Sequence, residues 1–259
     1  MARSVGNSKL VERVVSVLVD VDVSSAVIAF RPAVGEERCL PADRVATSVL
    51  MAANPWRTFR WYLGQRHYSG TYWSSTVAEH VIYESRLELS CLIRADFDPR
   101  VRAMVAQPFL LTADVDGRLR RHIPDYLWDT TDGPVVVDVV RAERLDHPKI
   151  ETMCAWTNEV VCSLGWGYRV VSDPEPVEFT NIRFLAGYRR DWLVPVGLRD
   201  AVRVAIPTLV GDSITQAEKR FQSLSGPLLR AALFTSLWRH ELGADLRAPL
   251  SPSTVLEKP

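Results

Sequence analysis

Two aspartates stand next to short apolar runs in the stretch RHIPDYLWDTTDGPVVVDVVR, which covers residues 121–141. Asp125 precedes one run rich in aromatic and β-branched residues, and Asp138 lies within another, and such runs are typical of strands. A buried carboxylate without a partner costs several kcal/mol, so side chains of this kind bind a metal, meet a cation, or lie at a strand end in water. The first of these interpretations is the one that carries chemistry.

A third carboxylate, Glu88, falls in a segment with apolar residues at helical spacing, and we predict a helix over 81–95. Glu84 lies one turn earlier on the same face. A helix carboxylate beside two strand carboxylates can hold Mg²⁺, which prefers oxygen ligands and usually takes one or two from the protein. Such a site suits phosphodiester hydrolysis, in which a nearby lysine commonly offsets the developing charge.

The elements around these residues predict an α/β core with a mixed sheet. Residues 101–128 predict two antiparallel strands joined at an Asp-Gly turn over 114–117, and the second strand delivers Asp125. The apolar run at 134–140 predicts a central strand. A helix over 149–165 and a strand over 166–172 follow, and the connection predicts that these last two strands are parallel. On a regular strand His122 faces away from Asp125, so we expect it to be exposed or to face DNA.

The flanking segments have a different character. Residues 11–34 predict a hairpin with its turn at 22–25. The stretch 55–75 mixes arginines with aromatic residues, which suits either nucleic-acid contact or a loop held to the core by its rings. Near the C-terminus, a short helix opening at 213 and a longer one over 228–243 predict either a helix-turn-helix or winged helix, or a helical cap that buries its leucines.

Composition excludes several classes of protein. The 259 residues are 47% hydrophobic and carry no net charge, which argues against nonspecific coating of nucleic acid. The charge is uneven, because residues 122–180 hold eleven acids against four bases. No apolar run is long enough to span a membrane and no signal peptide is evident, so we expect a cytoplasmic protein. The four cysteines show no metal or disulfide spacing, and motifs for nucleotide hydrolysis or serine chemistry are missing.

Five ordered blocks resemble the TnsA-like endonuclease subunits of heteromeric transposases, a similarity that spans roughly residues 55–190. The resemblance implies a restriction-endonuclease-like α/β core, a mixed β-sheet flanked by helices, over residues 55–195. A β-rich segment over 1–54 precedes it and a helical, winged-helix-like module over 196–259 follows. The blocks that carry the resemblance are residues 83–88, 97–101, 107–109, 122–127 and 137–139.

Position by position, the resemblance assigns metal binding to Glu88, Asp125 and Asp138, with Mg²⁺ as the cofactor and Mn²⁺ able to substitute. The sequence departs from the family where a lysine is expected, because Val140 occupies that position. Arg141 could supply the missing cation through a strand bulge, and Lys149 could reach back from the next helix. The remaining explanation is that cleavage has been lost.

The implied function is metal-dependent cleavage of one DNA strand at transposon ends. The implied partners are DNA, a DDE-type (TnsB-like) transposase and an ATP-dependent (TnsC-like) regulator, with no membrane. Two alternatives stay open. One is a catalytically impaired subunit that keeps the nuclease fold as a DNA-binding scaffold. The other is a stand-alone defence or repair nuclease of the same fold, which would cut without any partner.

Overall fold

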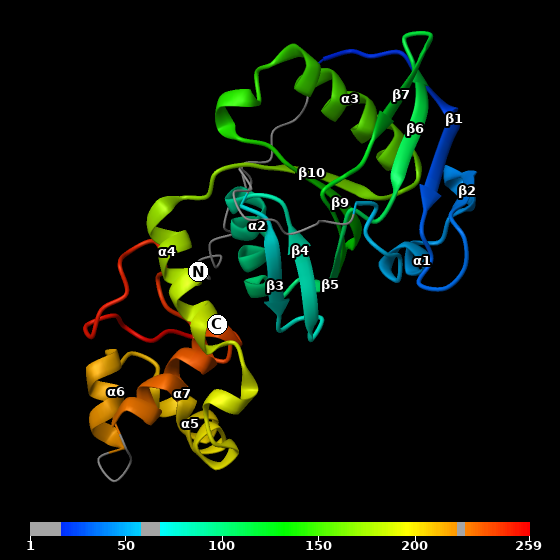
Figure 1. Cartoon of the computed structure of the whole chain (residues 1–259). Coiled ribbons are helices and arrows are strands. Elements are labelled where there is room, and N and C mark those ends of the chain that lie inside the picture. Colours follow the sequence, from blue (N-terminus) through cyan, green and yellow to red (C-terminus); the bar gives the residue numbers. More distant parts are fainter. Residues whose placement is uncertain (1–16, 58–67, 222–225) are drawn as a thin grey trace. The chain divides into compact units, whose positions relative to one another are not determined.

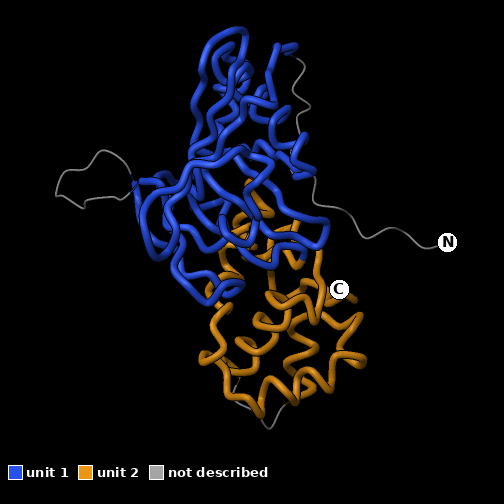
Figure 2. The backbone as a smooth tube through the Cα atoms, turned by 90° about the vertical axis from the view of Figure 1, so that its right-hand side faces the viewer, with its two compact units in different colours: residues 1–92, 100–173 blue, residues 93–99, 174–259 orange. Residues whose placement is uncertain are grey.

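The structure, a computed structural model, describes residues 17–57, 68–221 and 226–259. The chain forms two compact units, shown in Figure 2. Unit 1 comprises residues 1–92 and 100–173, and unit 2 comprises residues 93–99 and 174–259. The described residues form both helices and strands, so the fold is mixed α/β. The predicted domain boundaries at residues 54 and 195 stay a prediction.

The first sheet of unit 1 contains four antiparallel strands in the order β2-β1-β6-β7. Its two inner strands supply the buried apolar side chains, whereas β7 lies at an edge (Figure 1). The segment before residue 54 is thus part of a sheet with later strands. The strands are β1 (Val21–Phe30), β2 (Arg38–Pro41), β6 (Leu110–Val115) and β7 (Arg118–His122).

The hairpin predicted over 11–34 is wrong for the residues that the structure describes. Residues 21–30 form one strand, with a shift of register between Asp22 and Val27. Asp22 Oδ1 accepts hydrogen bonds from both the backbone N–H and the hydroxyl of Ser24. These local bonds satisfy the backbone at an irregularity within the strand, so the polar residues mark a distorted strand and no chain reversal.

The second sheet of unit 1 has the order β10-β9-β8-β5. The predicted central strand is confirmed, because β9 lies between β8 and β10. Strands β9 and β10 are parallel and are joined through helix α3 (Pro148–Ser163), which confirms that prediction as well. The strands are β5 (Val101–Ala106), β8 (Tyr126–Thr130), β9 (Gly133–Val139) and β10 (Gly167–Val171).

The two long strands predicted over 101–128 are each interrupted, and their halves belong to different sheets. The Asp-Gly turn between β6 and β7 is confirmed, but β5 and β8 pair with each other in the second sheet. The first interruption is at Gln107 and Pro108, where Gln107 has φ +47°. The second includes Pro124. Proline has no N–H for a strand ladder, so both breaks are located where a sheet cannot continue.

Helix α2 (Arg86–Phe97) begins later than predicted, because residues 79–83 form strand β4 (Glu79–Tyr83), paired with β3 (Gly70–Ser74). Ser85 sets the start of the helix. Its hydroxyl oxygen accepts a hydrogen bond from Glu88 N at 3.1 Å, as an N-terminal capping residue does. The helix therefore begins with Glu88 in its first turn.

The core of unit 1 lies between the two sheets and α3. Leu127 and Val136 from the second sheet pack in one cluster with Trp156 and Val160 of α3 and with the buried residues of β1 and β6. Short helical segments complete this unit: η1 (Ala42–Arg44), α1 (Thr47–Met51) and η2 (Ala142–Arg144).

The described elements of unit 2 are helices, and residues 239–259 follow them as an irregular segment with isolated bridges. The predicted start of the short helix is confirmed by a capping box between Ser213 and Gln216. The predicted winged-helix module stays a prediction. No helix in the described part of the chain is both long and apolar enough to cross a membrane. The helices are α4 (Pro176–Leu185), η3 (Ala186–Tyr188), η4 (Asp191–Leu193), α5 (Val196–Leu209), α6 (Ile214–Arg220) and α7 (Gly226–Trp238).

Candidate functional site, a carboxylate cluster in unit 1

Glu88, Asp125 and Asp138 come together in unit 1, and we call them the carboxylate cluster. Glu88 is in the first turn of α2, Asp125 directly precedes β8, and Asp138 is on β9. The register pairs Tyr126 with Val137, so one step further places Asp125 opposite Asp138. Opposite residues of neighbouring antiparallel strands share a face, so these two side chains start from the same side of the sheet.

Asp125 is the member of the cluster whose protonation is most perturbed. Burial raises its pKa well above the ordinary value of 3.8, and the nearby negative charges of Asp138 and then Glu88 raise it further. The backbone N–H of Val139 donates to Asp125 Oδ2 at 2.6 Å and opposes this shift. Asp125 is thus a carboxyl group placed among other carboxyl groups, which is how sites for cations and for proton transfer are built.

Glu88 is held by hydrogen bonds at the start of α2. Its Oε2 accepts from the N–H of Glu84 at 2.7 Å, and its Oε1 accepts from the hydroxyl of Ser85 at 2.8 Å. Burial raises the pKa of Glu88, whereas these two hydrogen bonds lower it. The turn before α2 therefore fixes the orientation of the carboxylate toward the strands.

Asp138 is the most buried member, with 2% of its surface exposed. Its Oδ1 and Oδ2 lie 2.8 and 2.9 Å from Nε2 of His122, and the Tyr168 hydroxyl donates to Oδ2 at 2.6 Å. The expectation that His122 faces away from the site is wrong. Residues 123–125 connect two strands of different sheets, so strand alternation does not relate His122 to Asp125.

Val140, where the resemblance implies a lysine, lies in an apolar cluster of the core. Val140 is 8% exposed and packs with Cys154 and Val170. Tyr168 packs against this group, and burial raises the pKa of the Cys154 thiol to about 11. Val140 directly follows β9, and Tyr168, which packs against the cluster around Val140, donates its hydroxyl hydrogen bond to Asp138. An ammonium group at residue 140 would therefore start beside Asp138.

Neither predicted substitute for the lysine is buried with the cluster. Arg141 is exposed, and its Nη1 lies 3.7 Å from Oε1 of Glu143. Lys149 is exposed in the first turn of α3, where its backbone N–H donates to His147 Nδ1 at 3.2 Å. The structure thus unites the three carboxylates and leaves both cations at the surface.

Gln107 and Glu84 are further polar residues near the cluster that the sequence did not single out as contacts. The side-chain amide of Gln107 donates to Glu84 Oε1, and its Oε1 accepts from Arg57 N at 3.1 Å. The backbone N–H of Gln107 donates to the carbonyl of Asp125 at 2.9 Å. The left-handed backbone of Gln107 makes this possible by turning the chain between sheets. No sequence signal for this conformation exists, since glutamine rarely adopts it.

The aromatic and arginine-rich stretch near residue 60 is described only in part. Residues 58–67, which include Phe59, Trp61 and His67, lie outside the described residues. Trp56 is held to the first sheet, because Arg31 Nη1 donates to its carbonyl at 2.6 Å and the guanidinium lies 4.8 Å from the centre of its ring. For Trp56, the interpretation as a ring packed on the core is the one that these contacts favour.

The fit of a metal ion to the cluster is poor in this arrangement. Among the residues that the structure describes, no three His, Cys, Asp or Glu side chains are arranged to hold a metal ion. Both oxygens of Glu88 and both oxygens of Asp138 already lie within hydrogen-bonding distance of protein groups. Binding of a divalent cation by all three residues would require them to exchange these contacts.

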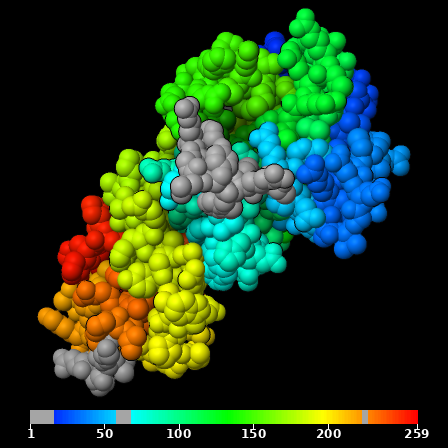
Figure 3. Space-filling view, viewed as in Figure 1, coloured from blue at the N-terminus to red at the C-terminus, as the bar shows by residue number. Residues whose placement is uncertain are grey.

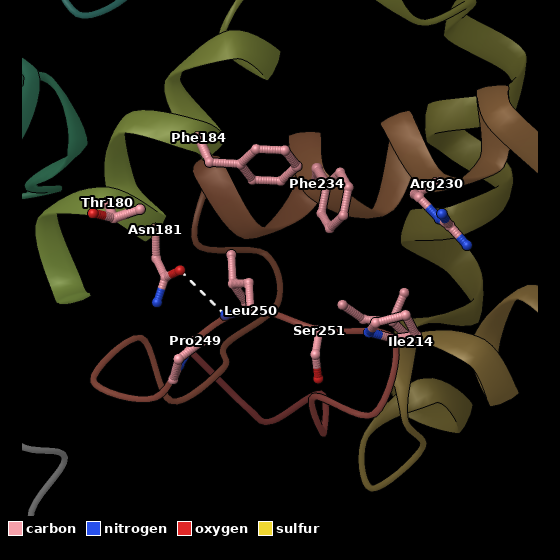
Figure 4. A pocket seen from close by; sticks show the side chains of 10 residues that line it. Thr180, Asn181, Phe184, Ile214, Arg230, Phe234, Pro249, Leu250 and Ser251 are labelled. Carbon is pink, nitrogen blue, oxygen red and sulfur yellow. Dashed lines mark hydrogen bonds between the residues drawn. The ribbon is translucent and has the colours of Figure 1, made fainter.

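Unit 2 contains a separate cavity of about 330 Å³. Figure 4 shows Phe184 of α4 and Phe234 of α7 on one side and the C-terminal segment on the other. Asn181 Oδ1 accepts from Leu250 N at 3.2 Å, which fixes that segment. Arg230 at the margin is paired with Glu218. The remaining lining residues are Thr180, Ile214, Pro249, Ser251 and Pro252.

Comparison with models of protein families finds no family that matches this chain, and comparison with curated proteins finds no match either.

Proposed function

We propose that this protein is the DNA endonuclease subunit of a heteromeric transposase of the TnsA-like type. In this proposal unit 1 contains a restriction-endonuclease-like core that cuts one strand at transposon ends by phosphodiester hydrolysis. Magnesium is the proposed cofactor, and a DDE-type transposase and an ATP-dependent regulator are the proposed partners. The helical residues near the C-terminus, proposed as a winged-helix-like module, are the proposed contact for those partners.

One observation supports the proposal above the others. Glu88, Asp125 and Asp138, which come from three separate parts of the sequence, gather at one place, and the pKa of Asp125 is raised by both of the other carboxylates. Carboxylates that repel one another are stabilised by a cation, and DNA hydrolysis needs one to offset the charge of the phosphate.

A second candidate function is a DNA-binding scaffold subunit that has lost cleavage. It is favoured by a specific observation, because Val140 at the lysine position is buried among apolar side chains while Arg141 and Lys149 are exposed. A valine cannot neutralise charge on a phosphate. The two candidates share DNA as a ligand and differ in hydrolysis, so an assay of hydrolysis separates them.

The test is nicking of supercoiled plasmid by the full chain, with and without the partner transposase, in magnesium and then in manganese. We expect Asp125→Asn to lower nicking by more than about 100-fold, since even residues outside a metal's ligand set typically contribute 10–100-fold. The matched control is Asp129→Asn, four residues further along at the other end of β8, which should nick like the wild type.

Each outcome assigns the protein to one class. Metal-dependent nicking that needs the partner and is lost in Asp125→Asn supports the transposase subunit. Nicking without any partner supports a stand-alone nuclease of the same fold. A folded wild-type protein that binds DNA and forms a complex with the transposase, yet nicks under none of these conditions, supports the scaffold.

A further inference from the structure

Strand β7 is an edge strand with a strong positive charge. Arg118, Arg120 and Arg121 are all exposed, and His122 ends the strand. Among the residues that the structure describes, β6 is the one strand that pairs with β7. Figure 1 shows that the β6–β7 hairpin extends beyond the neighbouring strands of unit 1, and in Figure 3 its tip (green) stands clear at the surface.

The positive charge of β7 is not neutralised within the described residues. None of its three arginines forms an ion pair there, whereas Arg31 lies 3.4 Å from Glu37 and Arg141 lies 3.7 Å from Glu143. Guanidinium groups without an intramolecular partner are free to bind carboxylates or phosphates through paired hydrogen bonds.

The strand alternation divides these arginines between two faces. Arg118, Arg120 and His122 lie at every second position of the strand and share one face, whereas Arg121 starts from the other face. Along a strand, residues two apart are separated by about 7 Å. His122 contacts Asp138, so the row that begins at Arg118 ends at the carboxylate cluster.

A purely structural role does not account for this arrangement. Charged side chains on an edge strand prevent pairing with another sheet, and for that role the face is immaterial. Arg118 and Arg120 lie on the face whose last residue, His122, contacts a buried carboxylate, so this face has a direction. The backbone of DNA is a suitable ligand, since each strand of a duplex carries negative charges at a regular spacing of about 3.4 Å of helix axis, about half the distance between the two arginines.

We propose that the Arg118–Arg120 face of β7 binds the phosphate backbone of DNA and guides the bound strand toward the carboxylate cluster. This inference rests on the proposed function, because it takes DNA as the ligand. Arg118 and Arg120 each contact a phosphate, and Arg121 on the opposite face does not. Binding is independent of base sequence, because phosphates carry no sequence information.

The experiment measures binding of the full chain to a fluorescently labelled DNA duplex at several salt concentrations, in EDTA so that no cleavage occurs. The slope of log K against log salt is negative, and each phosphate contact makes it steeper. We expect Arg118→Gln and Arg120→Gln each to reduce the magnitude of this slope by about 1, and the double variant to reduce it by about 2. Arg121→Gln is the matched control, with the same loss of charge on the same strand, and should leave the slope unchanged. Circular dichroism verifies that each variant is folded.

Several results would overturn the inference. An unchanged slope in the double variant would show that Arg118 and Arg120 do not contact phosphates. An equal reduction of the slope in Arg121→Gln would show an effect of net charge alone. If poly-glutamate competes for the protein against the labelled duplex as strongly as unlabelled DNA of equal total charge does, this face would be assigned to an acidic protein. If the wild type nicks plasmid but the double variant keeps the wild-type slope, the inference fails while the proposed function stands.

Failure of the proposed nuclease activity can likewise be distinguished from failure of the inference about the arginine face. If the double variant loses slope as expected and the wild type nicks no plasmid, the arginine face is supported, and the scaffold replaces the nuclease. A wild-type protein that binds no duplex even at low salt would overturn both the inference and the proposed function.

Discussion

Nε2 of His122 lies within 2.9 Å of both carboxylate oxygens of Asp138, and this contact joins the two four-stranded sheets of unit 1. His122 ends β7 of the first sheet, and Asp138 is on β9 of the second. The Tyr168 hydroxyl adds a third hydrogen bond to the same carboxylate. Because Asp138 is buried, its free energy depends on these partners.

Removing the tyrosine hydroxyl should therefore destabilise the protein. We expect Tyr168→Phe to lower the free energy of unfolding by about 1.5–3 kcal/mol, the range for hydrogen bonds to charged groups. Tyr126→Phe is a matched control, because Tyr126 is also buried but donates to a neutral carbonyl, that of Ile82, at 3.3 Å. Loss of this hydrogen bond in Tyr126→Phe should lower the free energy of unfolding by about 0.5–1.5 kcal/mol. Denaturant unfolding measures both, and an equal or smaller effect of Tyr168→Phe would contradict this account of Asp138.

The raised pKa of Asp125 predicts a pH dependence of stability. Above the ordinary pKa of 3.8 the unfolded chain loses this proton while the folded chain still holds it. The unfolded state then binds fewer protons, so the free energy of unfolding falls as pH rises from about 3.8 toward the raised pKa of the folded state. Asparagine does not ionise, and its carbonyl can still accept the bond from Val139 N.

We therefore expect Asp125→Asn to gain stability relative to the wild type as pH rises through this window. Unfolding by urea at a series of pH values measures the difference. Glu88→Gln should show the same sign, since burial raises the pKa of Glu88 as well. A stability difference between Asp125→Asn and wild type that does not vary with pH would show that Asp125 ionises equally in both states.

A lysine introduced at residue 140, where the resemblance implies one, separates the two candidate functions. Val140→Lys replaces a buried apolar side chain, so we expect a loss of stability on the order of 2 kcal/mol. If unit 1 is a nuclease, the ammonium group beside Asp138 should increase metal-dependent nicking of plasmid. Val140→Met controls for the change in volume without charge. A stable Val140→Lys protein that nicks no better than Val140→Met would count against hydrolysis at this site.

Much of the second sheet could be predicted because its signals are local. The run of valines before Asp138 is apolar on both faces, as a central strand requires. In the first sheet, the Asp-Gly turn at 116–117 likewise marks the β6–β7 hairpin. The division of the chain between two sheets could not be predicted this way. It depends on the left-handed backbone of Gln107 and on the partners of each strand, which are distant in sequence.

In the candidate site too, the residues with local sequence signals could be predicted and their distant partners could not. Asp125 and Asp138 were identified by their type and their place beside apolar runs, and Glu88 was assigned by the resemblance; the structure brings the three together. Their partners were missed, since the contact of His122 with Asp138 crosses between sheets and that of Tyr168 crosses between parallel strands. The alternation of the strand at 166–172 would have placed Tyr168 on one face, but only the register shows that this face is the one carrying Asp138.

Gln107, whose backbone N–H donates to the carbonyl of Asp125, allows a test of the break between β5 and β6. Both Gln107→Ala and Gln107→Gly lose the side-chain bonds to Glu84 and to Arg57 N, but only glycine adopts a positive φ without strain. A left-handed conformation costs other residues roughly 1–2 kcal/mol, so we expect Gln107→Gly to be the more stable of the two variants by up to about 1 kcal/mol.

The same pair of substitutions at Gln216 should give the opposite order. Gln216 is in helix α6, where its Oε1 accepts from Ser213 N, so both variants again lose a side-chain bond. Glycine in a helix is less stable than alanine by roughly 0.5–1 kcal/mol. Urea unfolding of the four variants measures both differences. If alanine is favoured at residue 107 as it is at residue 216, then the positive φ of Gln107 is not a feature of the folded protein, and the path by which the chain reaches Asp125 would need another explanation.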